Sequence, residues 1–156
     1  MNNIRNLNNI LTQLYNNVIK VEETVMKKSK AQNLSVTEVH TLEAIGQGDA
    51  KTMTHVADAL KINVSTLTAA INKLVTKGYV DRFRIPEDRR IVKVMLTETG
   101  KRAVREHEAF HFLFVREALS QLSSEETAKL VESLENVHEI LLMRIAKNKQ
   151  KLHLAK

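Results

Sequence analysis

The stretch "YVDRFRIPEDRRIVKVML", residues 79–96, contains the only proline of the chain and decides how its middle part folds. Two runs rich in β-branched and aromatic residues, 79–84 and 91–96, are typical of short strands. Pro86 has a fixed φ and no N–H to give to a strand ladder, so it suits the turn between the two runs. The stretch therefore predicts a β-hairpin whose tip, "IPEDRR" at residues 85–90, is charged.

The preceding segment, "NVSTLTAAINKLVTKG" at residues 63–78, predicts a helix that begins after Asn63 and ends before Gly78. At 100° per residue its larger apolar residues fall on one side. The other side carries small residues and a single charge: Ser65, Thr68, Ala69, Asn72, Lys73 and Thr76. Such a face can approach DNA closely, because Ser, Thr and Asn bond base edges and alanine contacts the thymine methyl. Packing against another protein surface explains the same pattern.

The rest of the chain predicts five more helices, which makes the fold mainly α. Capping boxes at Ser35/Glu38 and Ser123/Glu126 begin two of them, and Thr52 can cap a short one. The expected helices cover residues 4–28, 36–46, a short segment after Thr52, 98–121 and a final stretch to about 147. We therefore expect a winged helix-turn-helix lobe at 34–97. A long N-terminal helix at 1–33 precedes it, and long C-terminal helices at 98–147 and a basic tail at 148–156 follow it; dimerisation through these N- and C-terminal helices is what a family resemblance implies.

Composition narrows the class of protein. Hydrophobic residues make up 43% of the 156 residues, which is enough for a folded core. The absence of cysteine excludes disulfides and thiolate metal sites within the chain. There is no run of about 18 apolar residues, and the start lacks the apolar region of a signal peptide. We therefore expect a cytoplasmic protein.

Charge is distributed unevenly along the chain, whose net charge is +6. Residues 73–102 contain nine Lys or Arg and four acidic residues, whereas residues 103–143 contain three basic and eight acidic ones. A basic block of this kind predicts a localised contact with a polyanion. A solvated basic surface is the alternative.

The hairpin adds arginines to this block. Arg82 and Arg84 are two residues apart on the first strand, so they project from one face. Arg89 and Arg90 lie at the tip, where a wing reaches a narrow minor groove that attracts arginine. Asp88 is expected to orient an arginine side chain by a charge-assisted bond. Alternatively, the tip is only a charged loop with surface ion pairs worth ~0–1 kcal/mol.

With these features, the sequence resembles the MarR family of winged-helix repressors over nearly its whole length. The resemblance is carried by the helix pair at 52–77, by "KGYVDR" at 77–82, by "DRR" at 88–90 and by "LTETG" at 96–100. It implies a homodimer, joined by its first and last helices, on double-stranded palindromic operator DNA, and hence association with the nucleoid. Two recognition helices would then lie about one DNA turn apart.

The resemblance also implies a role for individual residues. Base reading falls to Ser65, Thr66, Thr68, Ala69, Asn72 and Lys73, and backbone contacts fall to Thr37, Thr52, Thr54 and Lys77. The wing contacts fall to Arg82, Arg84, Arg89 and Arg90, with Asp88 as the orienting acid. Which of Arg89 and Arg90 enters the minor groove stays open.

Within the family, the segments 16–23, 38–46 and 107–115 are similar to the branch of fatty-acid-synthesis repressors. That similarity implies a long-chain acyl group on acyl carrier protein as corepressor, and no resident cofactor. The effector pocket would include His40, His107, Phe110 and His111. A small hydrophobic or phenolic ligand that releases the repressor is an alternative.

A zinc-sensing branch of the family is similar at the same histidines. Glu22 or Glu23, His40, His107 and His111 would match its ligands, and the i,i+4 pair of histidines can hold a metal. That branch's second site resembles a mixed cysteine and carboxylate cluster, however, and this chain has no cysteine. Histidines in a plain polar network are the third possibility. No nucleophile elbow or glycine-rich phosphate loop is present, so we do not expect an enzyme.

Overall fold

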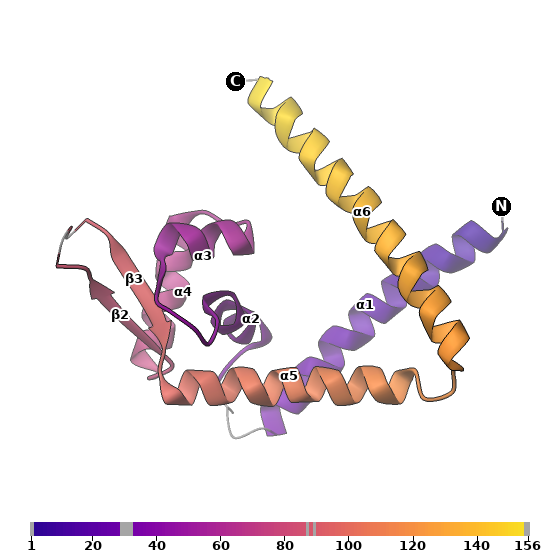
Figure 1. Cartoon of the computed structure of the whole chain (residues 1–156), viewed down its shortest axis with the longest axis horizontal. Coiled ribbons are helices and arrows are strands. Elements are labelled where there is room, and N and C mark those ends of the chain that lie inside the picture. The colour runs from indigo at the N-terminus through magenta and orange to yellow at the C-terminus, as the bar shows by residue number, and fades with distance from the viewer. Residues whose placement is uncertain (1, 29–32, 87, 89, 155–156) are drawn as a thin grey trace. The chain divides into compact units, whose positions relative to one another are not determined.

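The computed structural model describes residues 2–28, 33–86, 88 and 90–154. It contains two compact units, Met1–Ala109 and Phe110–Lys156, and the division falls inside helix α5. The helices in chain order are α1 (Asn2–Lys28), α2 (Val36–Ile45), α3 (Met53–Leu60), α4 (Val64–Thr76), α5 (Glu98–Ala118) and α6 (Ser124–Leu154) (Figure 1). The strands are β1 (Lys51–Thr52), β2 (Val80–Arg84) and β3 (Val92–Leu96).

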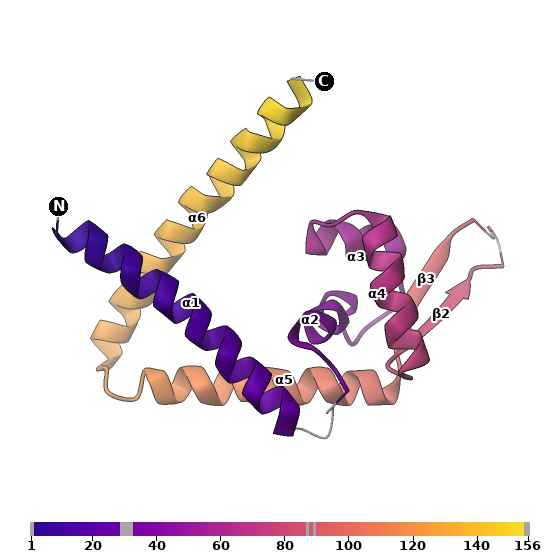
Figure 2. The ribbon, with the colours of Figure 1, turned by 180° about the vertical axis from the view of Figure 1, so that it is seen from behind.

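The first unit contains a winged helix-turn-helix. Strands β2 and β3 form the predicted antiparallel hairpin, and β1 adds to the outer edge of β3, which gives the order β1-β3-β2. Helices α3 and α4 lie beside this sheet (Figure 2). Side chains from α2, α3, α4, β2, β3 and α5 meet in one apolar core, in which Leu42, Leu67, Ile71, Leu74 and Val94 are fully buried. The core therefore holds α4 and the hairpin as one body.

The caps predicted from sequence begin the helices as expected. The side chains of Ser35, Thr52 and Asn63 accept backbone hydrogen bonds at the starts of α2, α3 and α4. Both capping boxes are confirmed, since Glu38 bonds the Ser35 N–H at 2.8 Å and Glu126 bonds the Ser123 N–H at 2.9 Å. These contacts satisfy N–H groups that a helix start leaves without partners, so the chain enters each helix at a defined residue.

Gly100 is required by close packing at the start of α5. A Cβ at this position would collide with the carbonyl oxygen of Tyr79. The same carbonyl accepts the Thr97 N–H at 3.1 Å, and the Thr97 hydroxyl donates to the Gly78 carbonyl at 2.8 Å. The segment "LTETG" therefore ties the end of β3 and the start of α5 to the turn that follows α4.

The second unit consists of the end of α5 and the long helix α6. Helix α6 continues to Leu154, so the prediction of an end near 147 was wrong, and the tail expected at 148–156 is helical as far as it is described. Its residues contain no Gly or Pro, and Lys, Gln and Leu are good helix formers. Helix α5 ends at Ala118, three residues before the predicted boundary. None of the described helices is long and apolar enough to cross a membrane.

Candidate nucleic-acid interface

The outer face of α4 presents the residues that the sequence assigned to base reading. Asn63 caps the helix by accepting the Thr66 N–H at 2.7 Å, and Leu67, Ile71 and Leu74 bury the opposite face. The exposed or half-buried residues on the outer face are Ser65, Thr66, Thr68, Ala69, Asn72 and Lys73. The helix therefore shows a surface of hydroxyls, an amide and a single ammonium, as expected.

Two hydroxyls on this face use their hydrogen inside the protein. The Thr68 hydroxyl donates to the Val64 carbonyl at 2.7 Å, and the Ser65 hydroxyl donates to Asn63 Oδ1 at 2.6 Å. These directions are fixed by chemistry, because a carbonyl oxygen only accepts and Asn63 Oδ1 already accepts a backbone N–H. In this state Ser65 and Thr68 offer outward lone pairs, which suit an amino group on a base better than a phosphate oxygen.

Arg82 lies on β2 and reaches the recognition face of α4. Its guanidinium Nη1 donates to Asn72 Oδ1 at 2.8 Å. The sequence placed Arg82 among the wing contacts, and the contact with Asn72 was not expected from it. Arg82 and Arg84 are both exposed, together with Phe83 between them.

One groove collects predicted DNA contacts from three separate segments. It runs between the helix pair and the hairpin and is lined by Thr52, Met53, Thr54, Val64, Thr68, Arg82, Arg90, Ile91 and Val92. The family resemblance had assigned five of these to DNA contacts: Thr52, Thr54, Thr68, Arg82 and Arg90. Threonines and arginines up to 38 positions apart in the chain thus lie along one groove, whose floor also includes the apolar side chains of Met53, Val64, Ile91 and Val92.

Asp88, which was predicted to orient an arginine side chain, binds the backbone of the turn at the tip of the hairpin, and its role toward Arg89 stays a prediction. Its carboxylate Oδ1 accepts the backbone N–H of Arg90 at 2.9 Å, and its carbonyl accepts the Ile91 N–H at 3.0 Å. Among the described residues, this carboxylate therefore shapes the turn's backbone, as short acidic side chains do in turns, instead of holding the Arg90 guanidinium. Arg89 lies outside the described residues.

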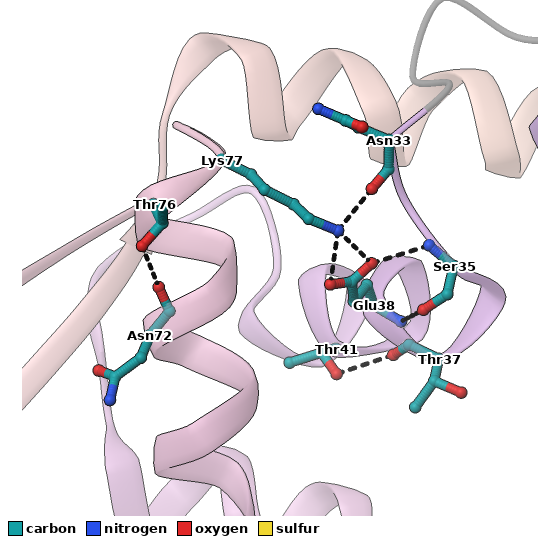
Figure 3. A network of polar contacts seen from close by, with 8 residues as sticks. All are labelled: Asn33, Ser35, Thr37, Glu38, Thr41, Asn72, Thr76 and Lys77. Carbon is teal, nitrogen blue, oxygen red and sulfur yellow. Dashed lines mark hydrogen bonds and ion pairs between the residues drawn. The ribbon is translucent and has the colours of Figure 1, made fainter.

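Lys77, which was expected to contact the DNA backbone, is half-buried, and its ammonium is bound by groups of the protein. Its ammonium binds both carboxylate oxygens of Glu38 at 2.8 Å and also the carbonyl oxygen of Asn33 (Figure 3). The Lys77 and Glu38 side chains are only 28% and 13% exposed. This network joins the end of α4 to the start of α2. Thr37 is exposed beside it, and the Thr52 side chain caps α3.

The contacts of Glu38 predict how the stability of the fold depends on pH. Burial raises the pKa of Glu38, but the bonds from Lys77 and Ser35 outweigh it, and the pKa lies below its ordinary value. A carboxyl whose pKa is lower in the folded than in the unfolded protein stabilises the fold. This stabilisation is complete above the pKa in the unfolded chain, about 4.3, and is lost as the pH falls through the pKa in the folded protein. Glu38→Gln should therefore lower the free energy of unfolding at pH 7 by about 1 kcal/mol, and the deficit should shrink in acid.

Urea unfolding at pH 7 and at pH 3 measures this. Glu125→Gln is the matched control, because its pair with Lys129 is exposed and should contribute much less. A Glu38→Gln deficit that is the same at both pH values would contradict the assigned role.

Glu22 on α1, His40 on α2 and His107 on α5 come together within the first unit. Their side chains offer ligand atoms within 4.8 Å of one another. His107 is buried, its Nδ1 lies 2.6 Å from Glu43 Oε1, and its ring meets that of His40 edge-on at 5.5 Å. One carboxylate and imidazoles are a donor set that zinc accepts, and a carboxylate on the second ring nitrogen is typical of zinc-binding histidines.

The other residues of the expected effector pocket belong to the second unit. Phe110 is tilted against His111, with ring centroids 5.2 Å apart, and stacks with Phe114 at 6.0 Å. His111 follows His107 by four residues along α5. Glu23 is exposed, whereas Glu22 is buried, so Glu22 is the one of the two that faces the histidines.

Known proteins share this architecture. Residues 34–92 match the model of the MarR family. The transcriptional regulator PecS of Dickeya dadantii is 31% identical over 120 residues, which cover 77% of this chain and 72% of PecS. The chain belongs to the MarR family. PecS is a transcriptional regulator, and the members of this family are transcriptional regulators rather than enzymes.

Structural similarity supports this membership. Streptococcus pneumoniae FabT, solved in complex with DNA, is 33% identical with a TM-score of 0.83, over 88% of this chain and 96% of FabT. The uncharacterised regulator YpoP of Bacillus subtilis is 32% identical over 74 residues, 47% of this chain. The chain thus spans about half of the length of YpoP, 52%. A Bacillus stearothermophilus MarR-family protein, at 18% identity and a TM-score of 0.76, shows the shared fold alone.

Proposed function

We propose that this chain is a homodimeric repressor that binds palindromic operator DNA through α4 and the β2–β3 wing. The observation that carries the proposal is the groove in which Thr52, Thr54, Thr68, Arg82 and Arg90 come together. Threonine hydroxyls and arginines are common partners of phosphates and bases. FabT, one of the similar proteins of known structure, was solved in complex with DNA.

Exposed apolar side chains support the dimer. Helix α6 exposes an apolar seam over about four turns: Leu130, Leu134, Val137, Leu141 and Ile145. Helix α1 likewise exposes Ile4, Leu7, Ile10, Leu11 and Leu14. A heptad-like seam of this kind is buried against a second helix in coiled coils, and a large exposed apolar patch indicates an interface.

We propose that the effector is a long-chain acyl group on acyl carrier protein. It would act as a corepressor, so that the product of fatty-acid synthesis represses the genes of its own synthesis. The support is similarity to FabT and the aromatic cluster of Phe110, His111 and Phe114. Acyl carrier protein is acidic, so the basic surfaces of the repressor would attract it. The ligand transmits only the difference between its affinities for the two forms of the dimer.

The Glu22, His40 and His107 cluster favours a second candidate, regulation by zinc. In that case the three side chains would supply ligands, and zinc would hold α1, α2 and α5 together within the first unit. Either effector would act by stabilising the form of the dimer that fits DNA.

One titration separates these candidates. Binding to a selected DNA duplex is measured by gel shift with acylated carrier protein, with unacylated carrier protein, with zinc and with chelator. The corepressor proposal predicts at least fivefold tighter binding with the acylated carrier alone, in the range typical of allosteric coupling. Equal binding with both carriers contradicts it. Zinc-dependent binding that His40→Gln abolishes would establish the second candidate, and release by a small hydrophobic or phenolic compound would favour neither.

A further inference from the structure

We infer that Arg82 is a positioning residue that fixes which end of the Asn72 amide reads DNA. An asparagine side chain can turn its amide by half a rotation, and then offers an oxygen where it had offered an NH₂ group. Arginine has donors only, so the atom bonded to Arg82 Nη1 at 2.8 Å must be the Asn72 oxygen. The contact therefore sets the direction of the amide before DNA arrives.

The consequence is a defined hydrogen-bond polarity at the second half of α4. With Oδ1 engaged by the wing strand, Asn72 offers its two N–H groups to the base. Purine N7, guanine O6 and thymine O4 accept such bonds in the major groove, whereas the cytosine amino group only donates. Ser65 and Thr68, one to two turns earlier, have the opposite polarity because their hydrogens are used internally.

The position of Arg82 favours this role over a simple phosphate contact. It lies two residues before Arg84 on the same strand, and of these two arginines only Arg82 forms a hydrogen bond with α4 among the described residues. Grooves on both sides of it are lined by α4 residues, Thr68 in one and Asn72 in the other. The side chain thus occupies the junction between the wing and the recognition helix.

The expected effect is a change in sequence preference, not only in affinity. A bond that discriminates between bases contributes on the order of tenfold preference at one base pair. Without Arg82 the amide turns freely, cytosine is accepted through the oxygen, and the preference at that base pair should fall to about twofold. If Arg82 instead bound a phosphate, its loss would weaken binding to all sequences alike and lower the slope of log affinity against log salt concentration by about one unit.

The experiment selects duplexes from a randomised library with the full-length protein, Asn72→Ala, Arg82→Met and Arg84→Met. Asn72→Ala identifies the base pair that Asn72 reads. Arg82→Met should relax preference at that same base pair, and the double variant should resemble Asn72→Ala alone. Arg84→Met is the matched variant of a second wing arginine: it should weaken binding to all sequences alike and keep the preference at that base pair. Arg82→Ala repeats the test if the melting temperature shows that Arg82→Met folds poorly.

The outcomes separate this inference from the proposed function on which it rests. If the unaltered protein enriches no sequence, the proposed function fails. If it enriches a sequence and Arg82→Met retains the full preference at the Asn72 base pair, with unchanged or uniformly weaker binding, Arg82 does not position the amide. An Asn72→Ala profile identical to that of the unaltered protein would overturn the inference as well.

Discussion

Arg90→Ala is expected to weaken binding to the selected operator by about tenfold or more, with no loss of folded dimer. Arg90 is exposed at the tip of the wing and lines the groove with Thr52 and Thr68. Its backbone N–H is held by the Asp88 carboxylate, so the turn carries the side chain in a defined place. Removing the guanidinium removes a cationic contact with DNA and leaves the apolar core untouched.

The measurement is a fluorescence anisotropy titration at several salt concentrations. If Arg90 binds a phosphate, the slope of log affinity against log salt concentration should be lower by about one unit in the variant. If Arg90 enters the minor groove, the loss of affinity should be greater on sites with a narrow groove. Arg102→Ala, an exposed arginine on α5 that does not line the groove, is the matched control and should bind nearly as well. Equal losses in the two variants would show that only net charge matters.

Leu141→Asp is expected to separate the dimer and, as a consequence, to reduce operator binding by two orders of magnitude or more. Leu141 is 53% exposed in the single chain and lies seven residues after Leu134, at the same place in the seam of α6. Burying an aspartate there without a partner costs several kcal/mol, which a dimer interface cannot absorb. Two half-site contacts then no longer act together on one DNA molecule.

Light scattering coupled to gel filtration measures the mass directly. Ala128→Asp on the opposite side of α6 is the control and should remain dimeric. A Leu141→Asp variant that stays dimeric would remove the α6 seam from the interface, and attention would then turn to the apolar residues of α1.

Local signals in the sequence predicted the helices, the hairpin and the outer face of α4. Ser35, Asn63 and Ser123 are short polar residues at helix starts, and their effect depends only on neighbours three residues away. Burial of Leu67, Ile71 and Leu74 follows from helical spacing alone. These interactions are local, so one sequence suffices to predict them.

The contacts missed from sequence are those between distant residues. Lys77 and Glu38 are 39 positions apart, and nothing near either of them shows that the lysine faces inward. Arg82 and Asn72 belong to a strand and a helix whose packing sets their distance. Strand β1 has two residues, too few for an alternating pattern, and is defined only by its pairing with Val94 and Lys93.

Selection of duplexes by the full-length protein from a randomised DNA library tests the central claim most directly. A dimer that inserts two α4 helices predicts an enriched palindrome whose half-site centres lie about 10 base pairs apart. It also predicts that affinity falls by at least 10³-fold between 50 and 200 mM salt. Enrichment of no sequence, or of one unpaired half-site bound by a monomer, would contradict the account.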